Sequence, residues 1–184
     1  MRFFVQNHTA MQQPKTVRIV LRAMEPADID AIYSWENDPS LWGVSAAHQP
    51  FSRQALQRFI DESSGLDIYA SRQLRLMACD GSETVGCVDL YDFDPYHRRA
   101  GIGIMVDGRL RHRGYGAAML AAVEEFARQH LALHQLYSVV ANDNHHSISL
   151  FGKAGYAPGG TLKEWTFADG RWVDATMYQK IIEK

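Results

Sequence analysis

The sequence predicts one α/β (α+β) domain built on a mixed, mostly antiparallel central sheet with helices on both faces. Three observations lead to this fold class. Residues 74–106 contain three consecutive strand-like segments with turn residues between them. A long amphipathic helix begins near Gly114, and a hairpin-like pair of segments occupies residues 161–181. The length of 184 residues also suits a single domain.

The composition is that of a globular protein and argues against several classes of function. Hydrophobic residues make up 46% of the chain and charged residues 22%, which is enough apolar material for a sizeable core. The net charge of −2 gives no argument for a nucleic-acid partner. No apolar run approaches the roughly 20 residues that span a bilayer, and residues 1–13 do not resemble a signal peptide. We therefore expect a cytoplasmic protein without a membrane partner.

The two cysteines, Cys79 and Cys87, lie in neighbouring strand-like segments. Two cysteines do not make a disulfide framework, so reduced and buried thiols are expected, although a disulfide between them stays open.

The N-terminal third is predicted to hold one strand and two helices. Residues 1–16 are polar and aperiodic, which predicts a loose arm before a domain of residues 17–184. Alternating apolar residues predict a strand over residues 17–21. Pro26 can open a first helix, which Asn37-Asp38-Pro39 ends. Residues 40–50 are predicted to form a loop, and Ser52 is predicted to cap a second helix that runs to about Glu62.

The rest of the chain alternates strands with helices. The long helix is predicted from apolar residues at spacings of three and four, from Met119 to Ala127. Gly101 and Gly103 lie within a strand, where glycine often marks a bulge or a close backbone approach. The remaining predicted elements are strands over 74–79, 84–93, 100–106 and 135–141, a helix over 148–153 capped by Asn144 or Ser147, and a hairpin of 161–167 with 172–181.

The segment between the third of these middle strands and the long helix carries the most specific chemistry. Residues 106–116 place arginines and glycines where a strand ends and a helix begins. The first backbone N–H groups of a helix have no intrahelical partner and carry partial positive charge, so such an end binds phosphate. Gly114 and Gly116 leave room for a ligand, and Arg111 and Arg113 add positive charge. A pyrophosphate is the expected guest, and a solvated surface turn is the alternative.

This segment also resembles a known motif. Arg111-His112-Arg113-Gly114-Tyr115-Gly116 is similar to the R/Q-x-x-G-x-G/A acetyl-CoA motif of GNAT acetyltransferases. About thirty residues downstream, residues 144–156 resemble the family's N-x-x-S-x-x-L-Y-x-x-x-G-F segment. The resemblance covers roughly residues 17–182. It is nearest to the spermidine N-acetyltransferases and the related ribosomal-protein N-terminal acetyltransferases.

The resemblance implies acetyl-CoA as co-substrate and no metal. In the family the fourth and fifth strands separate, and the pantetheine arm pairs with the edge of the fourth strand. Helix capping by Asn144 can coexist with a CoA contact, and Lys153 is as readily a solvated helix lysine. For Tyr115 a packing role is favoured over a role as an acid. The cofactor-binding residues that the resemblance implies are Ile104, Met105, Val106, Arg111, His112, Arg113, Gly114, Tyr115, Gly116, Asn144, Phe151 and Lys153.

Three departures from the family pattern bear on catalysis. Phe151 stands where the family commonly has a tyrosine that protonates the leaving thiolate. Gly101 replaces the glutamate that follows the His97-Arg98-Arg99-Ala100 run. Residues 43–49 lack the carboxylates that would receive a polyamine.

The remaining candidate for catalysis is Asp89, as a base or a contact of the acceptor amine. It matches the glutamate of the spermidine pattern, and an exposed position on the polar face of a strand explains it equally well. His145 and His146 lie beside the cofactor segment and could relay a proton, because histidine titrates near working pH.

The sequence thus predicts transfer of an acetyl group from acetyl-CoA to a primary amine of a small molecule or a peptide N-terminus, not to a polyamine. The alternative is a GNAT-fold protein that binds CoA or a metabolite with little or no transferase activity, and Phe151 and Gly101 favour it. A third hypothesis is an interaction domain whose basic loop binds another anion, against which residues 144–156 argue. Assembly into a homo-oligomer is left open.

Overall fold

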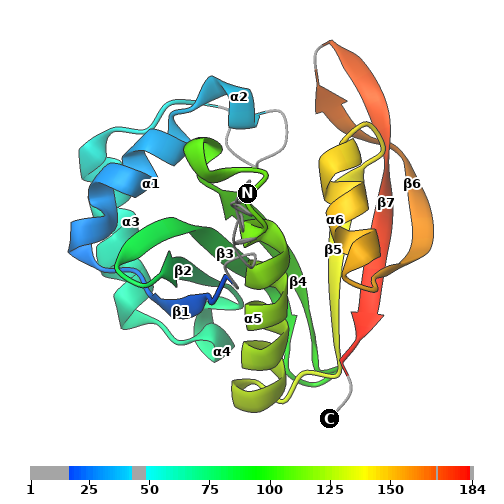
Figure 1. Ribbon diagram of the computed structural model, residues 1–184, viewed down its shortest axis with the longest axis horizontal. Helices are drawn as coiled ribbons and strands as arrows, with labels where there is room; N and C mark the ends of the chain where they lie inside the picture. The colour runs from blue at the N-terminus through cyan, green and yellow to red at the C-terminus, as the bar shows by residue number, and fades with distance from the viewer. Residues whose placement is uncertain (1–16, 43–48, 169, 183–184) are drawn as a thin grey trace, which may run out of the picture.

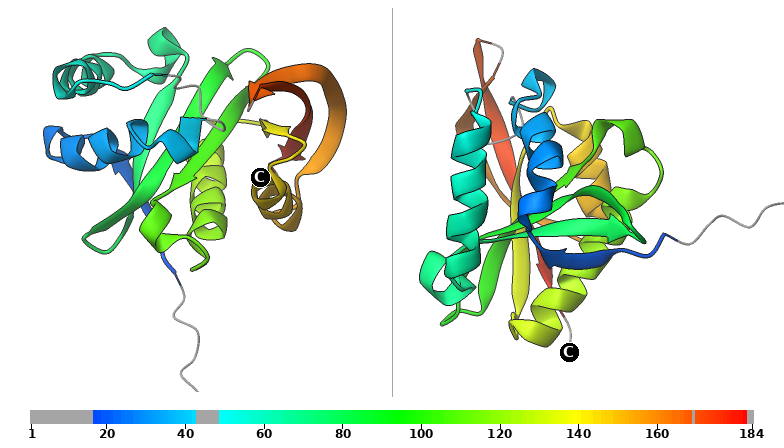
Figure 2. Two further views of the ribbon diagram at one scale, coloured as in Figure 1. Left: turned by 90° about the horizontal axis from the view of Figure 1, so that it is seen from above. Right: turned by 90° about the vertical axis from the view of Figure 1, so that its left-hand side faces the viewer.

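One seven-stranded sheet forms the centre of the computed structural model, which describes residues 17–42, 49–168 and 170–182 (Figure 1). The strand order is β1-β2-β3-β4-β5-β7-β6. Neighbouring strands are antiparallel except β4 and β5, which are parallel. Helices lie against both faces of the sheet, as Figure 2 shows from two sides. The predicted mixed, mostly antiparallel α/β fold is therefore confirmed.

The elements follow the chain in a regular order. The strands are β1 (Val20–Ala23), β2 (Leu74–Asp80), β3 (Glu83–Asp94), β4 (Arg99–Val106), β5 (Gln135–Ala141), β6 (Ala157–Ala168) and β7 (Arg171–Ile181). The helices are α1 (Ile29–Glu36), α2 (Pro39–Trp42), α3 (Arg53–Gly65), α4 (Ile68–Ser71), α5 (Tyr115–His130) and α6 (His145–Lys153), with 3-10 turns η1 (Pro26–Asp28) and η2 (Gly108–Leu110).

Turn and cap residues set several of these boundaries. Gly81 has a φ of +64° in the turn between β2 and β3, a backbone region that suits glycine. At the start of α3, the Ser52 hydroxyl accepts a hydrogen bond from the backbone N–H of Ala55 at 3.1 Å. These contacts confirm the predicted turn and the predicted cap.

Side chains on the two faces of the sheet enter two separate cores. Successive strand residues point to opposite faces, so Val88 packs on one side of β3 and Cys87 on the other. The Val88 face meets α5, and its core includes Leu90, Ile102, Met119, Leu120 and Val123. The Cys87 face meets α1 and α3, and its core includes Ile32, Trp35, Leu56, Ile60 and Met77.

Cys79 and Cys87 are both free and buried, which confirms the expected reduced thiols. Burial raises the pKa of the Cys87 thiol to about 12, so it stays protonated and packs as a small apolar side chain.

β4 and β5 pair only where they begin. Their register joins Arg99 to Gln135, Ala100 to Leu136 and Gly101 to Tyr137, and stops there. β4 nevertheless continues to Val106 and β5 to Ala141. Figure 1 shows the two strands diverging from their shared lower end. The structure thus confirms the separated fourth and fifth strands that the family resemblance implies.

Four local features differ from what the sequence indicated. β1 starts at Val20, because Val17 and Ile19 pack against the core without pairing to β2. Residues 39–42 form the short helix α2 within the expected loop, and the unpredicted helix α4 caps its N-terminus with Asp67. The bulge that Gly101 and Gly103 could mark lies on β3 instead, where the register shifts between Tyr91 and Asp94 and Asp92 has a φ of +49°.

Within the described ranges, no helix is long and apolar enough to cross a membrane. The predicted arm, residues 1–16, lies outside the described residues, so the division of the chain at residue 16 stays a prediction.

Candidate functional site

The predicted phosphate loop lies at the start of α5. The chain leaves β4 at Val106, passes through η2 and residues 111–113, and enters α5 at Gly114. Gly114 is the N-cap and has a φ of +85°, so the loop turns through a backbone conformation that favours glycine. The N-terminus of a 16-residue helix therefore faces this loop with its free N–H groups.

A buried carboxylate holds the loop in place. Asp107 is 6% exposed and accepts hydrogen bonds from the Arg109 backbone N–H at 2.9 Å and from the Arg109 guanidinium at 2.7 and 2.9 Å. The indole N–H of Trp35, on α1, donates to the same carboxylate at 3.1 Å. The bonds from Arg109 hold the pKa of Asp107 well below its ordinary range, although burial acts in the opposite direction. Asp107 thus ties the loop to the helix layer on the other face.

The basic side chains of the loop remain available to an anion. Arg111, His112 and Arg113 are exposed, and His112 has a φ of +62°. The His112 ring lies 5.7 Å from the ring of His146, centroid to centroid. Since His146 is the second residue of α6, the starts of α5 and α6 lie close together (Figure 1). The sequence singled out both regions but not the contact between them.

Gly116 and Tyr115 play different parts at the start of α5. A Cβ built on Gly116 would lie 3.2 Å from Cδ2 of Leu150 on α6 and 3.9 Å from Cγ2 of Val106 on β4. Gly116 thus faces the space between α6 and β4. The side chain of Tyr115 is buried, and its hydroxyl donates to Asp80 at 3.1 Å, which favours the packing role.

The three cofactor-binding residues predicted at α6 lie in different places: at its start, in its last turn and on the face that packs against the core. Asn144 caps the helix, accepting from the backbone N–H of Ser147 at 3.0 Å. Lys153 is exposed in the last turn, and it borders a hollow of about 230 Å³ between α5 and α6. Phe151 is 4% exposed and packs edge-on against Tyr156, with ring centroids 5.1 Å apart. Phe151 therefore belongs to the core beside the loop, and its contact with a cofactor stays a prediction.

The predicted β4 edge, residues 104–106, lies beyond the last β4–β5 pair. Ile104 and Val106 pack against the core on the α5 face, and Met105 packs against the core under α1 and α3. Their backbone pairs with β3 on one side, Met105 opposite Cys87. On the β5 side, no described strand pairs with residues 104–106. An extended ligand can therefore pair with the backbone of this edge as an added strand would.

Asp89 has a firm partner on the sheet. It pairs with Arg75 across β2 and β3, and both carboxylate oxygens accept from the guanidinium, at 2.7 and 3.0 Å. Arg75 also donates to Glu36 of α1 at 2.5 Å. Burial acts to lower the pKa of Arg75, but the charges of Asp89 and Glu36 more than offset it and hold that pKa well above its usual range. The geometry therefore favours Asp89 as a structural ion-pair partner, and its catalytic role stays a prediction.

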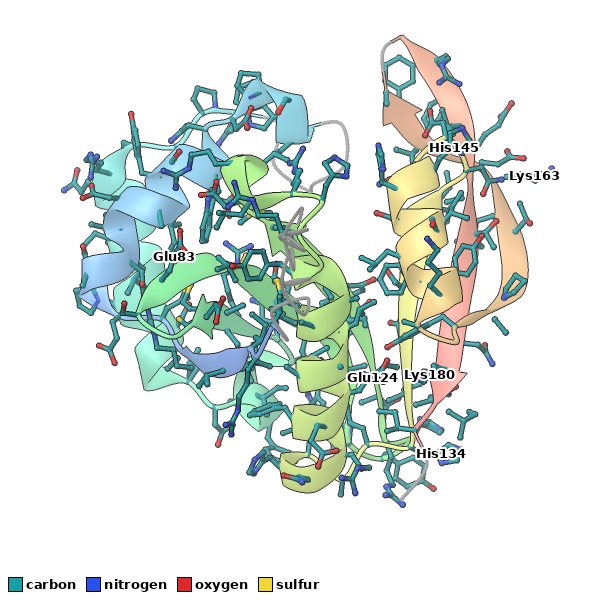
Figure 3. The ribbon with its side chains drawn as sticks, in the orientation of Figure 1. Glu83, Glu124, His134, His145, Lys163 and Lys180 are labelled. Carbon is teal, nitrogen blue, oxygen red and sulfur yellow. The ribbon has the colours of Figure 1, made fainter. Side chains whose placement is uncertain are left out.

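A hollow of larger volume than the one beside Lys153 lies elsewhere, between the C-terminal half of α5 and β7. It measures about 600 Å³, and the ion pair of Glu124 and Lys180 at 2.7 Å is part of its wall. Figure 3 shows these two side chains between α5 and β7, while His145 lies at the far end of α6. None of the predicted site residues lines this hollow. Among the described residues, no group of three or more His, Cys, Asp or Glu side chains could hold a metal ion.

Comparisons with known proteins point to one family. A family model described as an acetyltransferase (GNAT) domain matches residues 18–157. The spermidine N(1)-acetyltransferase of Escherichia coli (strain K12) is 23% identical over 165 residues, covering 88% of this chain and 85% of its own. An L-amino acid N-acetyltransferase of the same strain is 27% identical over 160 residues, covering 85% and 94%.

Solved structures share the fold. A spermidine N-acetyltransferase from Vibrio cholerae, in complex with CoA and spermine, matches with a TM-score of 0.79 at 22% identity, over 90% of this chain and 96% of its own. A dodecameric structure of the Vibrio cholerae enzyme matches with a TM-score of 0.74 at 23% identity, over 89% and 94%.

Proposed function

This chain belongs to the GNAT acetyltransferase family, and we propose that it transfers the acetyl group of acetyl-CoA to a primary amine of a small molecule or a peptide N-terminus. The chain is accordingly an N-acetyltransferase, and its relatives carry that activity in their names. The alternative of a binding protein without transferase activity gains no support from these relatives.

One structural observation carries the proposal. The uncovered edge of β4, residues 104–106, leads directly to the N-terminus of α5 and the exposed Arg111 and Arg113. An extended arm can pair with the strand edge while its pyrophosphate lies at the helix N-terminus, because both kinds of site offer free backbone N–H groups. Acetyl-CoA has this combination of an extended arm and a pyrophosphate. A solved relative binds CoA.

The acceptor is expected to be a single amine and not a polyamine. A cation with several charges needs several acidic groups to offset its desolvation, and residues 43–49 carry none. Residues 43–48 lie outside the described part of the chain, so this argument rests on the sequence. One relative is named as an L-amino acid N-acetyltransferase, which supports the proposal, whereas the relatives named as spermidine enzymes argue for testing polyamines directly.

The experiment measures free thiol released from acetyl-CoA in the presence of amino acids, peptides, simple monoamines and spermidine. We expect thiol release with one of the monoamines or peptides, at a lower KM than with spermidine. Replacing Arg111 and Arg113 together by alanine should raise the Kd for acetyl-CoA by about tenfold or more, which corresponds to about 1.4 kcal/mol. Arg58→Ala, an exposed position on α3, is the control and should leave the Kd unchanged.

Each result has a distinct meaning. Binding of acetyl-CoA without thiol release would favour the binding-protein alternative. Spermidine turnover well ahead of all other amines would refute the acceptor class. An unchanged Kd in the double arginine variant would refute the assignment of the loop.

We also propose that the chain self-associates. A solved relative is dodecameric. In this chain, Trp165, Phe167 and Trp172 are more than half exposed on the β6–β7 hairpin, and such aromatic side chains are typical of protein interfaces. The cytoplasmic location stays a prediction.

A further inference from the structure

The ring of Tyr91 lies across Gly101, at the point where β4 and β5 stop pairing. Tyr91 is opposite Gly101 in the β3–β4 pair, and Gly101 is opposite Tyr137 in the last β4–β5 pair. A Cβ on Gly101 would lie 2.1 Å from Cε2 of Tyr91 and 2.4 Å from Cζ, so only glycine leaves room for this ring. The Tyr91 ring meets the Tyr137 ring edge-on, with centroids 6.0 Å apart. The side chain thus crosses β4 and ends at β5.

The Tyr91 ring, which lies over Gly101 and against Tyr137, brings its hydroxyl next to β5 just beyond the last strand pair. Burial raises the pKa of the Tyr91 phenol, and hydrogen bonds from the Val139 backbone and the Ser138 side chain offset part of that rise. Val139 follows Tyr137 by two residues, in the part of β5 that β4 no longer pairs with. The Tyr91 hydroxyl is therefore located at the apex of the opening between the two strands.

Two residues of β4 next to Tyr91, Gly101 and Gly103, are glycines and have no side chains. Gly101 and Gly103 face the same side of the sheet as Asp89 and Tyr91, since directly opposed strand residues point to the same face. A Cβ on Gly103 would have its nearest contact at 3.8 Å, to the Cβ of Asp89, so the space above Gly103 is open. The Tyr91 ring thus covers Gly101, and the space above Gly103 beside it stays open next to Asp89.

The distance along β4 from the phosphate loop to Gly101 matches the length of a pantetheine arm. From Val106 to Gly101 the strand spans about 17 Å, at ~3.3 Å per residue, which is comparable to an extended pantetheine arm. An arm that starts at the Gly114 loop and follows the β4 edge therefore brings its thioester to the apex, beside the Tyr91 hydroxyl. An amine can approach the thioester through the space above Gly103.

We propose that Tyr91 is a catalytic residue that relays a proton from the acceptor amine to the leaving sulfur, an inference that rests on the proposed acetyl transfer. The nitrogen of a neutral amine forms a bond to the thioester carbon, and the carbon–sulfur bond breaks. The proton lost by nitrogen passes to the phenol oxygen while the phenol's own proton passes to sulfur. The products are the N-acetylated amine and the CoA thiol, and Tyr91 ends the step neutral, as it began.

The other candidates at the site are less suited to this step. Phe151 has no proton to donate, and both carboxylate oxygens of Asp89 are engaged by Arg75. A phenol that gives one proton as it receives another need never ionise, which agrees with its burial.

The test compares Tyr91→Phe with Tyr137→Phe. The first variant keeps the ring over Gly101 and loses the hydroxyl, and the second removes a neighbouring hydroxyl that donates to Asp92 at 3.3 Å. With an amine that the wild-type protein acetylates, Tyr91→Phe should lower kcat by about 100-fold or more and leave the acetyl-CoA Kd unchanged. The ratio of kcat in H2O to kcat in D2O should fall towards one in this variant. Tyr137→Phe should change neither quantity.

The outcomes separate the relay from a structural role and from the proposed function. A folded Tyr91→Phe protein with a lower Tm, wild-type kcat and an unchanged isotope ratio would overturn the relay and leave the acetyltransferase activity standing. Wild-type protein that binds acetyl-CoA but releases no thiol with any amine would overturn both. If Tyr91→Phe does not fold, Gly101→Ala displaces the ring while keeping the hydroxyl, and a folded Gly101→Ala protein with wild-type kcat would overturn the relay.

Discussion

Asp107 shows how one buried carboxylate can fix the geometry of a binding loop. It follows the last residue of β4 and caps η2, and its partners come from the loop itself and from Trp35 on α1. Hydrogen bonds to a charged group are each worth about 1.5–3 kcal/mol, and a buried carboxylate that lost them would be costly. Since Arg109 is largely exposed, its contribution is at the low end of that range.

Asp107→Asn should therefore lower the free energy of unfolding by about 1–3 kcal/mol at neutral pH. The bonds from Arg109 lower the pKa of Asp107 in the folded protein, so its stabilising effect is present above the unfolded pKa of about 3.9 and is lost as the pH falls below it. Urea unfolding of both proteins between pH 7 and pH 3 measures this difference. Asp30→Asn, in a surface pair where Asp30 is 80% exposed, is the control and should cost less than about 1 kcal/mol. Equal costs for the two variants would contradict the role of Asp107.

Functional residues could be predicted from the sequence only where they form a local pattern. The glycines and arginines of the loop could be found, because their spacing at a strand–helix junction is a local pattern. Asp89 was chosen as a base by resemblance, and its ion pair with Arg75 depends on the register of β2 and β3, which is not a local property. Tyr91 was missed because nothing near it in the sequence shows that its ring covers Gly101.

At the scale of the elements, periodicity and cap residues predicted the long strands and α5, and failed on short pieces. α4 has only four residues, too few for a periodic pattern, and its cap, Asp67, is a common surface residue. For the glycines of β4, sequence reasoning offered a bulge or a close approach. The structure has the close approach at Gly101, and the register shift lies on the neighbouring strand β3.

The two glycines of β4 should differ sharply when replaced by alanine. Gly101→Ala places a Cβ 2.1 Å from the Tyr91 ring and should lower the free energy of unfolding by about 1–3 kcal/mol, because the ring must move out of a packed position. Gly103→Ala is the matched control, since its Cβ would make an ordinary contact at 3.8 Å, and its stability should stay within about 0.5 kcal/mol of wild type. Thermal or urea unfolding measures both. Similar stability of the two variants would contradict the close approach of the ring.

At the scale of the whole molecule, the sheet consists of two parts joined by a narrow link. β1 to β4 form one antiparallel part and β5, β7 and β6 the other, and three residue pairs connect them. A ligand that pairs with β4 in the opening would add contacts between parts that the sheet itself joins weakly.

Acetyl-CoA should therefore raise the melting temperature. At a concentration of 100 times its Kd, a ligand that binds only the folded state stabilises it by about 2.7 kcal/mol. For a protein of this size that corresponds to a rise in Tm of about 5–11 °C. ADP carries the pyrophosphate without the pantetheine arm, so at the same concentration it should give a clearly smaller rise. Equal shifts from the two ligands, measured by differential scanning fluorimetry, would show that the arm adds nothing and would contradict its place along β4.

The division of the sheet also coincides with a division of the chain. Residues 20–106 contain all four strands of the first part, and residues 135–181 contain all three of the second. During synthesis on the ribosome, β1 to β4 can complete their mutual pairing, and α5 can cover their apolar face, before β5 has emerged. The edge of β4 at which we propose that acetyl-CoA binds is thus also the growing edge of the nascent sheet, and β5 pairs with only its first three residues.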